Sequence, residues 1–345
     1  MILGHGDDLY TYDGIEHNFS SNVWKHPEHS GLYRHLANYL PLITTYPEPD
    51  AASLRKLIAQ TEGVPANNIL LTPGSTSAIY LLSRELLDID DVYIVPPTFS
   101  EYKNASKLYH YPKAKVRELC RTDFNSYINK TSVLWLCNPN NPDGYAIPCD
   151  ELLEMIRKNS FVTFLLDMAY CDLTDVPMPT AAKLLKHKNV VAIYSLTKKY
   201  SIPGLRIGYI VAQRKLIASL EKTMMPWNIN SLAIEAAKYL ITQNVKPDKA
   251  SILAETQHLR SAINKLDGYK ALPTSTNFFL VRLKFSDSAT LKDYLAREHK
   301  ILIRDASNFE GLDNSFIRIA TQLPDENALL VKALDQFGQQ HRNKP

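Results

Sequence analysis

Several side chains able to do chemistry follow apolar runs of the chain. Asp167 ends one such run, Lys198 and Lys199 follow the run Val190–Ser195, and Arg206 comes shortly after them. A lysine can form a Schiff base with an aldehyde, a carboxylate can keep a ring nitrogen protonated, and an arginine can bind a phosphate. These groups together are what pyridoxal 5′-phosphate requires of a protein. Composition does not distinguish the two lysines.

Other residues near the same runs suit the remaining groups of this cofactor. Ser75 and Thr76 begin a predicted helix, where backbone amides favour a phosphate. Asn141 and Tyr170, the latter a catalytic candidate, are expected to hydrogen-bond the phenolic oxygen of the ring, and Phe99 to stack on its face. The cofactor-binding residues predicted in this way are Ser75, Thr76, Phe99, Asn141, Asp167, Tyr170, Ser195, Thr197, Lys198 and Arg206.

The elements that must position these residues are predicted to form an α/β fold. Most candidate strands are unbroken apolar runs, which is typical of strands covered on both faces. Predicted helices at Thr76–Leu87 and Cys149–Lys158 alternate with them, which favours a mostly parallel sheet flanked by helices. Ligands bind such sheets at the carboxyl ends of the strands, where the candidate residues lie. The predicted strands are Asn68–Thr72, Asp91–Pro96, Ser132–Cys137, Phe161–Asp167, Val190–Ser195 and Leu205–Val211.

The two ends of the chain differ from this central part. In the C-terminal third, predicted helices at Leu259–Lys265 and Glu326–Gln340 flank a predicted strand at Phe278–Leu283, which favours a smaller α+β unit. The first 45 residues lack clear periodicity and are predicted to form an arm.

Composition narrows the classes of protein. The chain has 345 residues, with 39 Lys and Arg against 36 Asp and Glu, and a net charge of +3 that argues against nucleic-acid binding. No apolar stretch approaches the roughly 20 residues that span a bilayer, so we expect no membrane partner. The start MILGHGDDLY has acids where a signal peptide has basic residues, which predicts a cytoplasmic protein. The four cysteines show no CxxC spacing, so we expect buried thiols and no metal site.

Three segments resemble the class I and II aminotransferases of fold type I, in particular the histidinol-phosphate aminotransferases. They are NPNNPDG (138–144), DMAY (167–170) and SLTKKYSIPGLRIGY (195–209), and the similarity runs from Tyr46-Pro47 to the C-terminus. In that family the Schiff-base lysine lies eight residues before the phosphate-binding arginine, and this spacing to Arg206 selects Lys198.

The resemblance also implies a domain organisation and a partner. Residues 45–240 would form a large domain that binds pyridoxal 5′-phosphate and residues 241–345 a small domain, with residues 1–44 as an arm and part of the small domain. Members of the family are homodimers with shared active sites. Tyr46 would then contact the cofactor phosphate of the neighbouring subunit.

Finer features resemble the threonine-phosphate decarboxylases of cobalamin synthesis. The resemblance lies in MPWNIN (225–230), in ILIRDASNFEGLDNSFIRIAT (301–321) and in the N-terminal GHGDD and NFSSN. It implies decarboxylation of L-threonine O-3-phosphate to (R)-1-amino-2-propanol phosphate and CO2, through an external aldimine formed as the substrate displaces Lys198. Two arginines and a histidine suit the carboxylate and phosphate of such a substrate. The implied substrate-binding residues are His5, Asn22, Asn141, Arg304 and Arg318.

Two alternatives remain open at this point. An aminotransferase acting on histidinol phosphate or a related amino acid with 2-oxoglutarate would also need arginines for its phosphate. A non-catalytic regulator with this fold would usually have a helix-turn-helix segment in front, for which we expect no room before Tyr46. The chain also departs from the family pattern, since Met168 replaces a usual Glu, Asp143 a usual Thr, and HGDD a usual HGGN. The N-terminal change lies near the implied substrate site.

Overall fold

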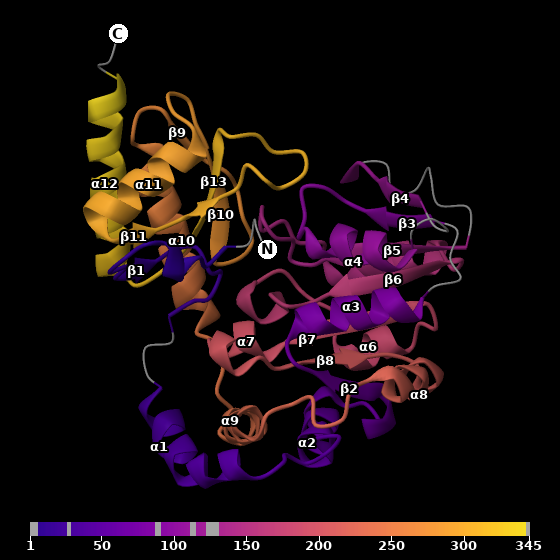
Figure 1. Ribbon diagram of the computed structural model, residues 1–345. Coiled ribbons are helices and arrows are strands. Elements are labelled where there is room, and N and C mark those ends of the chain that lie inside the picture. Colours follow the sequence, from indigo (N-terminus) through magenta and orange to yellow (C-terminus); the bar gives the residue numbers. More distant parts are fainter. Residues whose placement is uncertain (1–5, 26–28, 87–90, 111–114, 122–130, 343–345) are drawn as a thin grey trace.

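The computed structural model describes residues 6–25, 29–86, 91–110, 115–121 and 131–342 of the chain. The two larger β-sheets, each with its own helices, lie next to each other, and the N-terminal segment contacts both parts (Figure 1). Among the described residues, none of the helices combines the length and the apolar character that crossing a membrane requires.

The larger sheet has seven strands in the order β2-β8-β7-β6-β5-β3-β4. Strands β3 to β7 pair in parallel, whereas β8 is antiparallel to both of its neighbours. Because Gly208 of β8 pairs with Ser195 at the end of β7, Arg206 lies at the edge where the parallel strands end. The strands are β2 (Ile69–Thr72), β3 (Asp91–Ile94), β4 (Lys115–Glu118), β5 (Ser132–Cys137), β6 (Val162–Asp167), β7 (Val190–Ser195) and β8 (Gly208–Val211).

Helices cover both faces of this sheet, as the unbroken apolar runs predict. One core contains side chains of α2, α5, α6 and α9, and the other contains side chains of α3, α4 and α8. Adjacent residues of β2 divide between them, because Leu71 packs in the first core and Leu70 in the second. The helices are α2 (Ala52–Glu62), α3 (Ser75–Glu85), α4 (Glu101–His110), α5 (Cys149–Lys158), α6 (Ala181–Leu185), α7 (Leu196–Lys199), α8 (Arg214–Thr223) and α9 (Ser231–Thr242).

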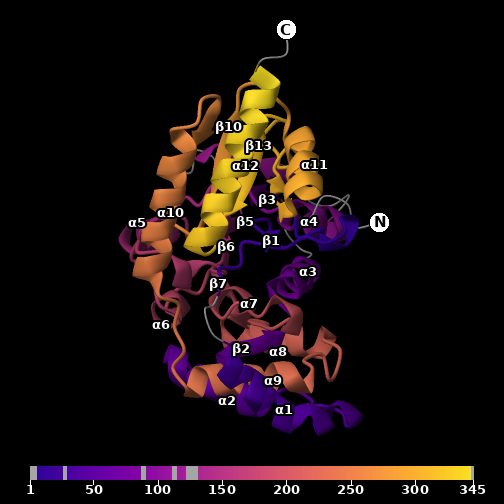
Figure 2. The same cartoon turned by 90° about the vertical axis from the view of Figure 1, so that its left-hand side faces the viewer.

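The smaller sheet has four antiparallel strands in the order β12-β13-β10-β9. Three helices cover one face of it, in front of the sheet in Figure 2, and share a core with β10 and β13. Its strands are β9 (Tyr269–Ala271), β10 (Phe278–Leu283), β12 (Arg304–Asp305) and β13 (Phe316–Ala320), and its helices are α10 (Lys249–Asn264), α11 (Ser288–His299) and α12 (Pro324–Arg342).

The N-terminal segment joins the two parts of the molecule. Its strand β1 (His17–Asn18) pairs in parallel with β11 (Ile301–Leu302) beside the smaller sheet. Its helix α1 (Ser30–Tyr39) packs against α9, and the ring of His35 stacks on Tyr239 with 4.6 Å between centroids. The helix at residues 30–39 was not among the predicted elements. Short 3-10 helices are η1 (Leu9–Thr11), η2 (Leu40–Thr44), η3 (Ala66–Asn68), η5 (Cys171–Leu173) and η6 (Pro203–Leu205).

Several predicted elements match the structure and others differ. Strands β5, β7 and β10 and helix α5 have the predicted bounds. Helix α10 begins at Lys249, well before the predicted Leu259, and the edge strand β4 was not predicted because most of its residues are exposed. Of the cysteines predicted to be buried, Cys137 and Cys149 are buried, whereas Cys120 is exposed.

Candidate active site

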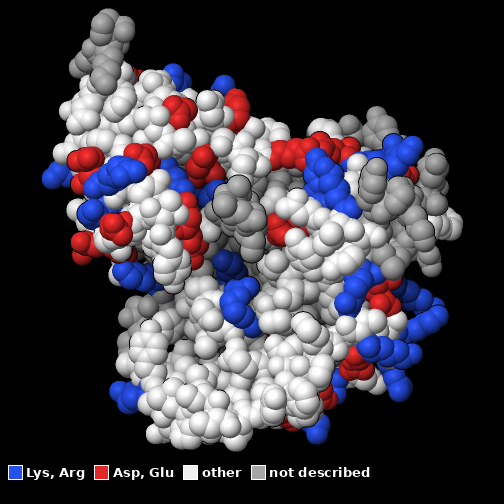
Figure 3. All heavy atoms as spheres, viewed as in Figure 1, with Lys and Arg blue, Asp and Glu red and all other residues white. Residues whose placement is uncertain are grey.

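A cavity of about 230 Å³ lies at the edge of the larger sheet where β5, β6 and β7 end. The N-terminal segment and the smaller sheet complete its walls, and basic side chains lie at the hollow between the two sheets in Figure 3. The predicted site residues that line it are Asn22, Ser75, Thr76, Phe99, Asn141, Asp167, Tyr170, Thr197, Lys198, Arg206, Arg304 and Arg318. The other lining residues are Gly6, Asp7, Ser20, Ser21, Val23, Ser100, Tyr102, Cys137, Ala169, Pro203 and Phe309.

The two adjacent lysines have different surroundings. They lie on the single turn of α7, where consecutive side chains point in directions about 100° apart. Lys198 lines the cavity and its Nζ donates to the carbonyl oxygen of Ser21 at 2.9 Å. Lys199 instead pairs with Asp172, with 3.1 Å between Nζ and Oδ1. The structure thus places Lys198 in the cavity wall and Lys199 in an ion pair behind it.

The pKa values of the two lysines reflect this difference in their surroundings. Burial, with the neighbouring Arg318 charge, lowers the pKa of Lys198 to about 8. Burial also acts to lower the pKa of Lys199, but the Asp172 carboxylate outweighs it, so that this pKa is raised. Lys198 therefore loses its proton, and becomes a nucleophile, more readily than its neighbour.

Asp167 is a buried carboxylate at the last position of β6, with 4% of its surface exposed. Its Oδ2 accepts a hydrogen bond from the Tyr102 hydroxyl at 2.8 Å, and its Oδ1 accepts one from the amide of Ala169 at 3.0 Å. Burial raises the pKa of Asp167, although these two donors oppose the effect. The carboxylate is thus held in one orientation and would favour a cationic partner in the cavity.

A phosphate-sized cradle forms where α3 begins. Gly74 precedes the helix with a φ of +82°, and a Cβ at this position would lie 2.5 Å from Nη2 of Arg206. The guanidinium therefore packs over the helix N-terminus, where free amides favour an anion. The Ser195 and Thr197 hydroxyls are hydrogen-bonded to each other at 2.7 Å, and of the two only Thr197 lines the cavity.

A buried polar network connects the larger sheet, the N-terminal segment and β13. Asn22 donates from Nδ2 to the Tyr170 hydroxyl at 3.2 Å, and Arg318 donates from Nη1 to Oδ1 of Asn141 at 2.6 Å. Burial lowers the pKa of Arg318 to about 9. Oδ1 of Asn22 and Nε of Arg318 are buried without a hydrogen-bond partner among the described residues. These two groups can therefore accept from and donate to a bound molecule.

Arg304 forms the remaining basic part of the wall. Its Nη2 donates to Oδ1 of Asn308 at 2.7 Å, and its guanidinium lies 5.3 Å from the centroid of the Phe309 ring. It is 7% exposed, and burial lowers its pKa. The neighbouring Asp305 accepts hydrogen bonds from Ser288 and from the amide of Ser307. Arg304 thus lies in the cavity wall rather than on the surface.

The residues present fit pyridoxal 5′-phosphate. An amine with a lowered pKa, a buried carboxylate and an anion cradle surround one cavity, in agreement with the three groups that the cofactor needs. Of these three features, the cradle depends most strictly on residue type, because any side chain at position 74 would meet Arg206.

Two predicted residues do not line the cavity, and one is outside the described part of the chain. Tyr46 is 78% exposed and packs on Trp227, with 4.8 Å between ring centroids. Ser195 lies behind Thr197. His5 is not among the described residues.

Sequence reasoning missed other residues of the wall. Tyr102, on α4, orients Asp167 and stacks on Trp135 at 5.0 Å between ring centroids. It could have been proposed from the sequence, because it lies close to the predicted Phe99. Ser20 and Ser21 contribute backbone carbonyls, which have no signature in a sequence. Asp7 also lines the cavity and has a φ of +66°. It belongs to the HGDD segment, which differs from the usual HGGN of the family.

Comparisons with known proteins agree on the family. The family model "Aminotransferase class I and II" matches residues 11–334. The crystal structure of L-threonine-O-3-phosphate decarboxylase from Porphyromonas gingivalis is 38% identical, with a TM-score of 0.89, and covers 94% of this chain and 100% of its own. A histidinol-phosphate aminotransferase from Thermoanaerobacter sp. strain X514 is 32% identical over 86% of this chain and 85% of its own length. A bifunctional protein of adenosylcobalamin biosynthesis from Leptospira interrogans is 27% identical over 88% of this chain and 36% of its own.

Proposed function

The chain belongs to the aminotransferase class I and II family, and within this family we propose that it decarboxylates L-threonine O-3-phosphate to (R)-1-amino-2-propanol phosphate and CO2. Its fold is the α/β fold of type I, as predicted, and its cofactor is pyridoxal 5′-phosphate. The chain is similar over nearly its whole length to a solved decarboxylase of this substrate, which supports the proposal. The similar histidinol-phosphate aminotransferase supports the alternative, transfer of an amino group to 2-oxoglutarate.

The charge of the cavity wall is the observation that carries the proposal. Its basic side chains are Lys198, Arg206, Arg304 and Arg318, and its acidic side chains are Asp7 and Asp167. We assign Lys198, Arg206 and Asp167 to the cofactor, which leaves Arg304 and Arg318 for the substrate. Both arginines are buried, so an anionic ligand would relieve the free energy cost of their desolvation. A substrate with a carboxylate and a phosphate supplies two such anions.

Each residue then has a role in the reaction. The bound cofactor supplies an electron sink for the carbon that loses CO2. Lys198 would bind the cofactor covalently through Nζ and, when its amine is free, would hold a proton there. Asp167, whose carboxylate Tyr102 orients, would keep a proton on the ring nitrogen. Tyr170 and Asn141 would hold the phenolic oxygen of the ring.

The groups that the arginines hold decide which bond breaks. In our proposal the wall formed by Arg304, Arg318 and Asn22 would anchor the substrate phosphate and leave the carboxylate free to depart as CO2. In an aminotransferase the arginines would instead hold the carboxylate in place.

We also propose that the protein is a homodimer with shared sites. Tyr46 is exposed on its own subunit, as a residue that reaches a neighbour must be. Its neighbour Trp227 is also exposed, and further exposed apolar side chains lie on α1, on η2 and at Met225. The lower part of Figure 3, where α1 lies, has few charges. Such a patch is typical of a protein interface. Its large exposed side chains are Tyr33, Leu40, Ile43, Tyr46, Met225 and Trp227.

A single assay separates the two candidate activities. The cofactor-loaded protein is incubated with L-threonine O-3-phosphate while CO2 and aminopropanol phosphate are measured. We expect both products in equal amounts and no 2-oxo acid. Absence of both products, together with amino transfer from histidinol phosphate to 2-oxoglutarate, would replace the decarboxylase with the aminotransferase.

A further inference from the structure

A strap of the N-terminal segment, residues 17–25, forms one wall of the cavity. The carbonyl oxygen of Ser20 accepts a hydrogen bond from Arg318, and that of Ser21 accepts one from Nζ of Lys198 at 2.9 Å. Asn22 donates to the hydroxyl of Tyr170 at 3.2 Å and to Oδ1 of Asn141 at 3.4 Å. Three consecutive residues of the strap thus contact the groups that we assign to cofactor and substrate.

The backbone conformation of Asn22, the last of these three residues, needs support from neighbouring contacts. Asn22 has a φ of +52°, in the left-handed region that a residue with a side chain rarely occupies. Such a conformation persists only where neighbouring contacts hold it. The larger part of the molecule holds the strap from one side, through Tyr170, Asn141 and Lys198. The smaller sheet and its helices hold it from the other side.

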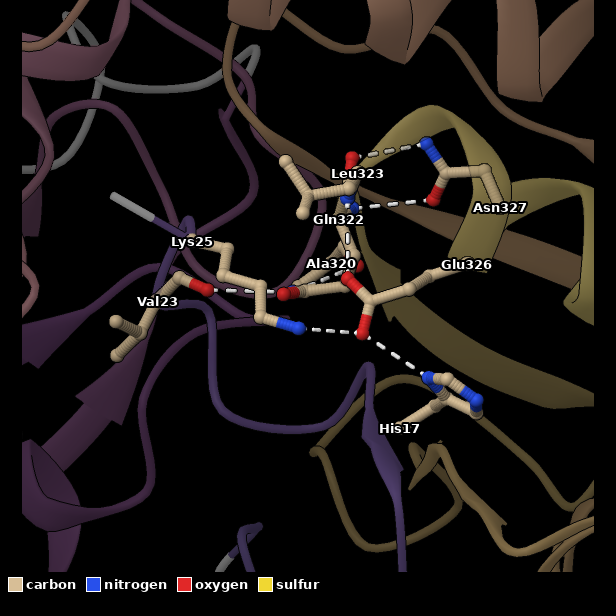
Figure 4. A network of polar contacts seen from close by, with 8 residues as sticks. All are labelled: His17, Val23, Lys25, Ala320, Gln322, Leu323, Glu326 and Asn327. Carbon is tan, nitrogen blue, oxygen red and sulfur yellow. Dashed lines mark hydrogen bonds and ion pairs between the residues drawn. The ribbon is translucent and has the colours of Figure 1, made fainter. Parts of the chain in front are cut away.

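Glu326 joins the two ends of the strap (Figure 4). Its Oε1 accepts from Nδ1 of His17 at 3.0 Å, at the start of the strap, and from Nζ of Lys25 at 2.6 Å, at its end. Glu326 lies in the first turn of α12 with 10% of its side chain exposed. Beside it, Gln322 donates from Nε2 to the carbonyl oxygen of Val23 at 3.2 Å.

We propose that Glu326 is a positioning residue for the substrate site, which clamps both ends of the strap and thereby holds Asn22 and the carbonyls of Ser20 and Ser21 in place. This inference rests on the proposed function in so far as the cavity is the place of reaction. Glu326 itself does not line the cavity. Its effect on the substrate is therefore indirect, and we assign it to the strap.

The electrostatics of the clamp favour this role. Burial opposes ionisation of Glu326, but the hydrogen bonds from Lys25 and His17 outweigh it and lower the pKa of Glu326. The carboxylate is therefore charged at neutral pH. Lys25 has 51% of its side chain exposed, so water can solvate its ammonium when the carboxylate is neutralised. Loss of the charge at Glu326 should thus release the strap without unfolding the protein.

The test compares Glu326→Gln with Asp325→Asn. Asp325 is an exposed acid in the same first turn of α12, so its variant matches the loss of charge and of helix-dipole interaction. We expect Glu326→Gln to speed amide hydrogen exchange in strap peptides and to raise the KM for L-threonine O-3-phosphate about tenfold, with kcat changed less than about threefold. Asp325→Asn should match the wild type, and all three proteins should show the same cofactor absorbance.

A second variant tests whether the clamp acts as a unit. Lys25→Met should raise the KM in the same direction, and adding it to Glu326→Gln should have little further effect. Unchanged strap exchange in Glu326→Gln, or faster exchange with an unchanged KM, would overturn the inference. The exchange measurement needs no substrate. Failure of the proposed reaction would instead appear as absent turnover in the wild-type protein.

Discussion

At the scale of single residues, two lysines of the same type have different surroundings, and these favour Lys198 as the nucleophile. Lys198 and Lys199 are adjacent, yet one lines the cavity and the other pairs with Asp172. Sequence alone did not separate them, and the spacing to Arg206 did so only through a family resemblance. The structure adds a physical reason, because a charged lysine that is paired with a carboxylate is a poor nucleophile.

Lys198→Ala should abolish the absorbance of the imine-bound cofactor. Lys199→Ala should keep that absorbance and lose only the ion pair with Asp172, which is partly buried. Visible absorption spectra of the two purified variants, with cofactor added in excess, provide the comparison. Loss of the band in Lys199→Ala but not in Lys198→Ala would contradict our assignment.

The pH dependence of cofactor attachment follows from the pKa of Lys198. Burial and the Arg318 charge disfavour the ammonium form and place this pKa at about 8. Only the neutral amine attacks an aldehyde, so the rate of reaction of cofactor-free protein with pyridoxal 5′-phosphate should rise with pH and level off above about 8. Stopped-flow absorbance measures this rate. A rate that still rises about tenfold between pH 8 and pH 9 would instead show an ordinary exposed lysine, whose pKa is about 10.4.

Arg304→Ala should weaken substrate binding far more than cofactor binding. Arg304 lies in the wall beside Phe309 and is assigned to the substrate. Loss of a buried charge-assisted contact costs about 2–4 kcal/mol, which corresponds to roughly a thirtyfold or greater rise in KM. Arg297→Ala is the matched control, because Arg297 is exposed and pairs with Asp293. Equal losses of substrate and cofactor affinity in Arg304→Ala would indicate a structural role.

At the scale of elements, the buried strands were predictable and the partly exposed elements were not. Strands β5 and β7 are buried along their whole length, so their apolar runs ended where the strands end. Strand β4 is an edge strand with mostly exposed residues, and α1 buries only Leu32. Neither therefore buries enough apolar side chains to have been recognised from the sequence. The antiparallel direction of β8 was also hidden, because direction leaves no trace in an apolar run.

The turn before α3 allows a test of the phosphate cradle. Gly74→Ala would place a Cβ 2.5 Å from Nη2 of Arg206 and force alanine into a φ of +82°. We expect Arg206 to shift, cofactor affinity to fall at least about tenfold, and stability to fall by about 1–3 kcal/mol. Gly63→Ala is the control, because Gly63 has a φ of +65° with no atom within 4 Å. Equilibrium dialysis of the cofactor and thermal unfolding separate the two effects.

At the scale of the whole molecule, the site is assembled from three distant parts of the chain. The motifs of the larger sheet predicted the residues that we assign to the cofactor, because these residues lie at strand ends that topology brings together. The resemblance predicted that Asn22 of the strap contacts the substrate, but the carbonyls of Ser20 and Ser21 were not predicted, because backbone groups have no signature in a sequence. The position of Arg318 facing Asn141 depends on how the smaller sheet sits against the larger one. Local patterns contain no information about that packing.

The proposed exchange of Tyr46 between subunits can be tested with hybrid dimers. One subunit has Lys198→Ala and the other has Tyr46→Ala, and two affinity tags allow the hybrid to be purified. If Tyr46 reaches the neighbouring site, the subunit with Tyr46→Ala receives an intact Tyr46 from its partner. Its site is then complete, whereas the other site lacks both groups. We therefore expect about half the wild-type activity, and one site per dimer that binds the cofactor with wild-type affinity.

The competing arrangement gives a different result with the same hybrid. If Tyr46 acted only within its own subunit, the hybrid would contain one dead site and one site with the defect of the Tyr46→Ala homodimer. Its activity would then be half that of this homodimer, which serves as the internal reference. Sedimentation of the wild-type protein as a monomer would contradict the shared site directly. Because Tyr46 is 78% exposed beside an apolar surface in the single subunit, we expect the first result.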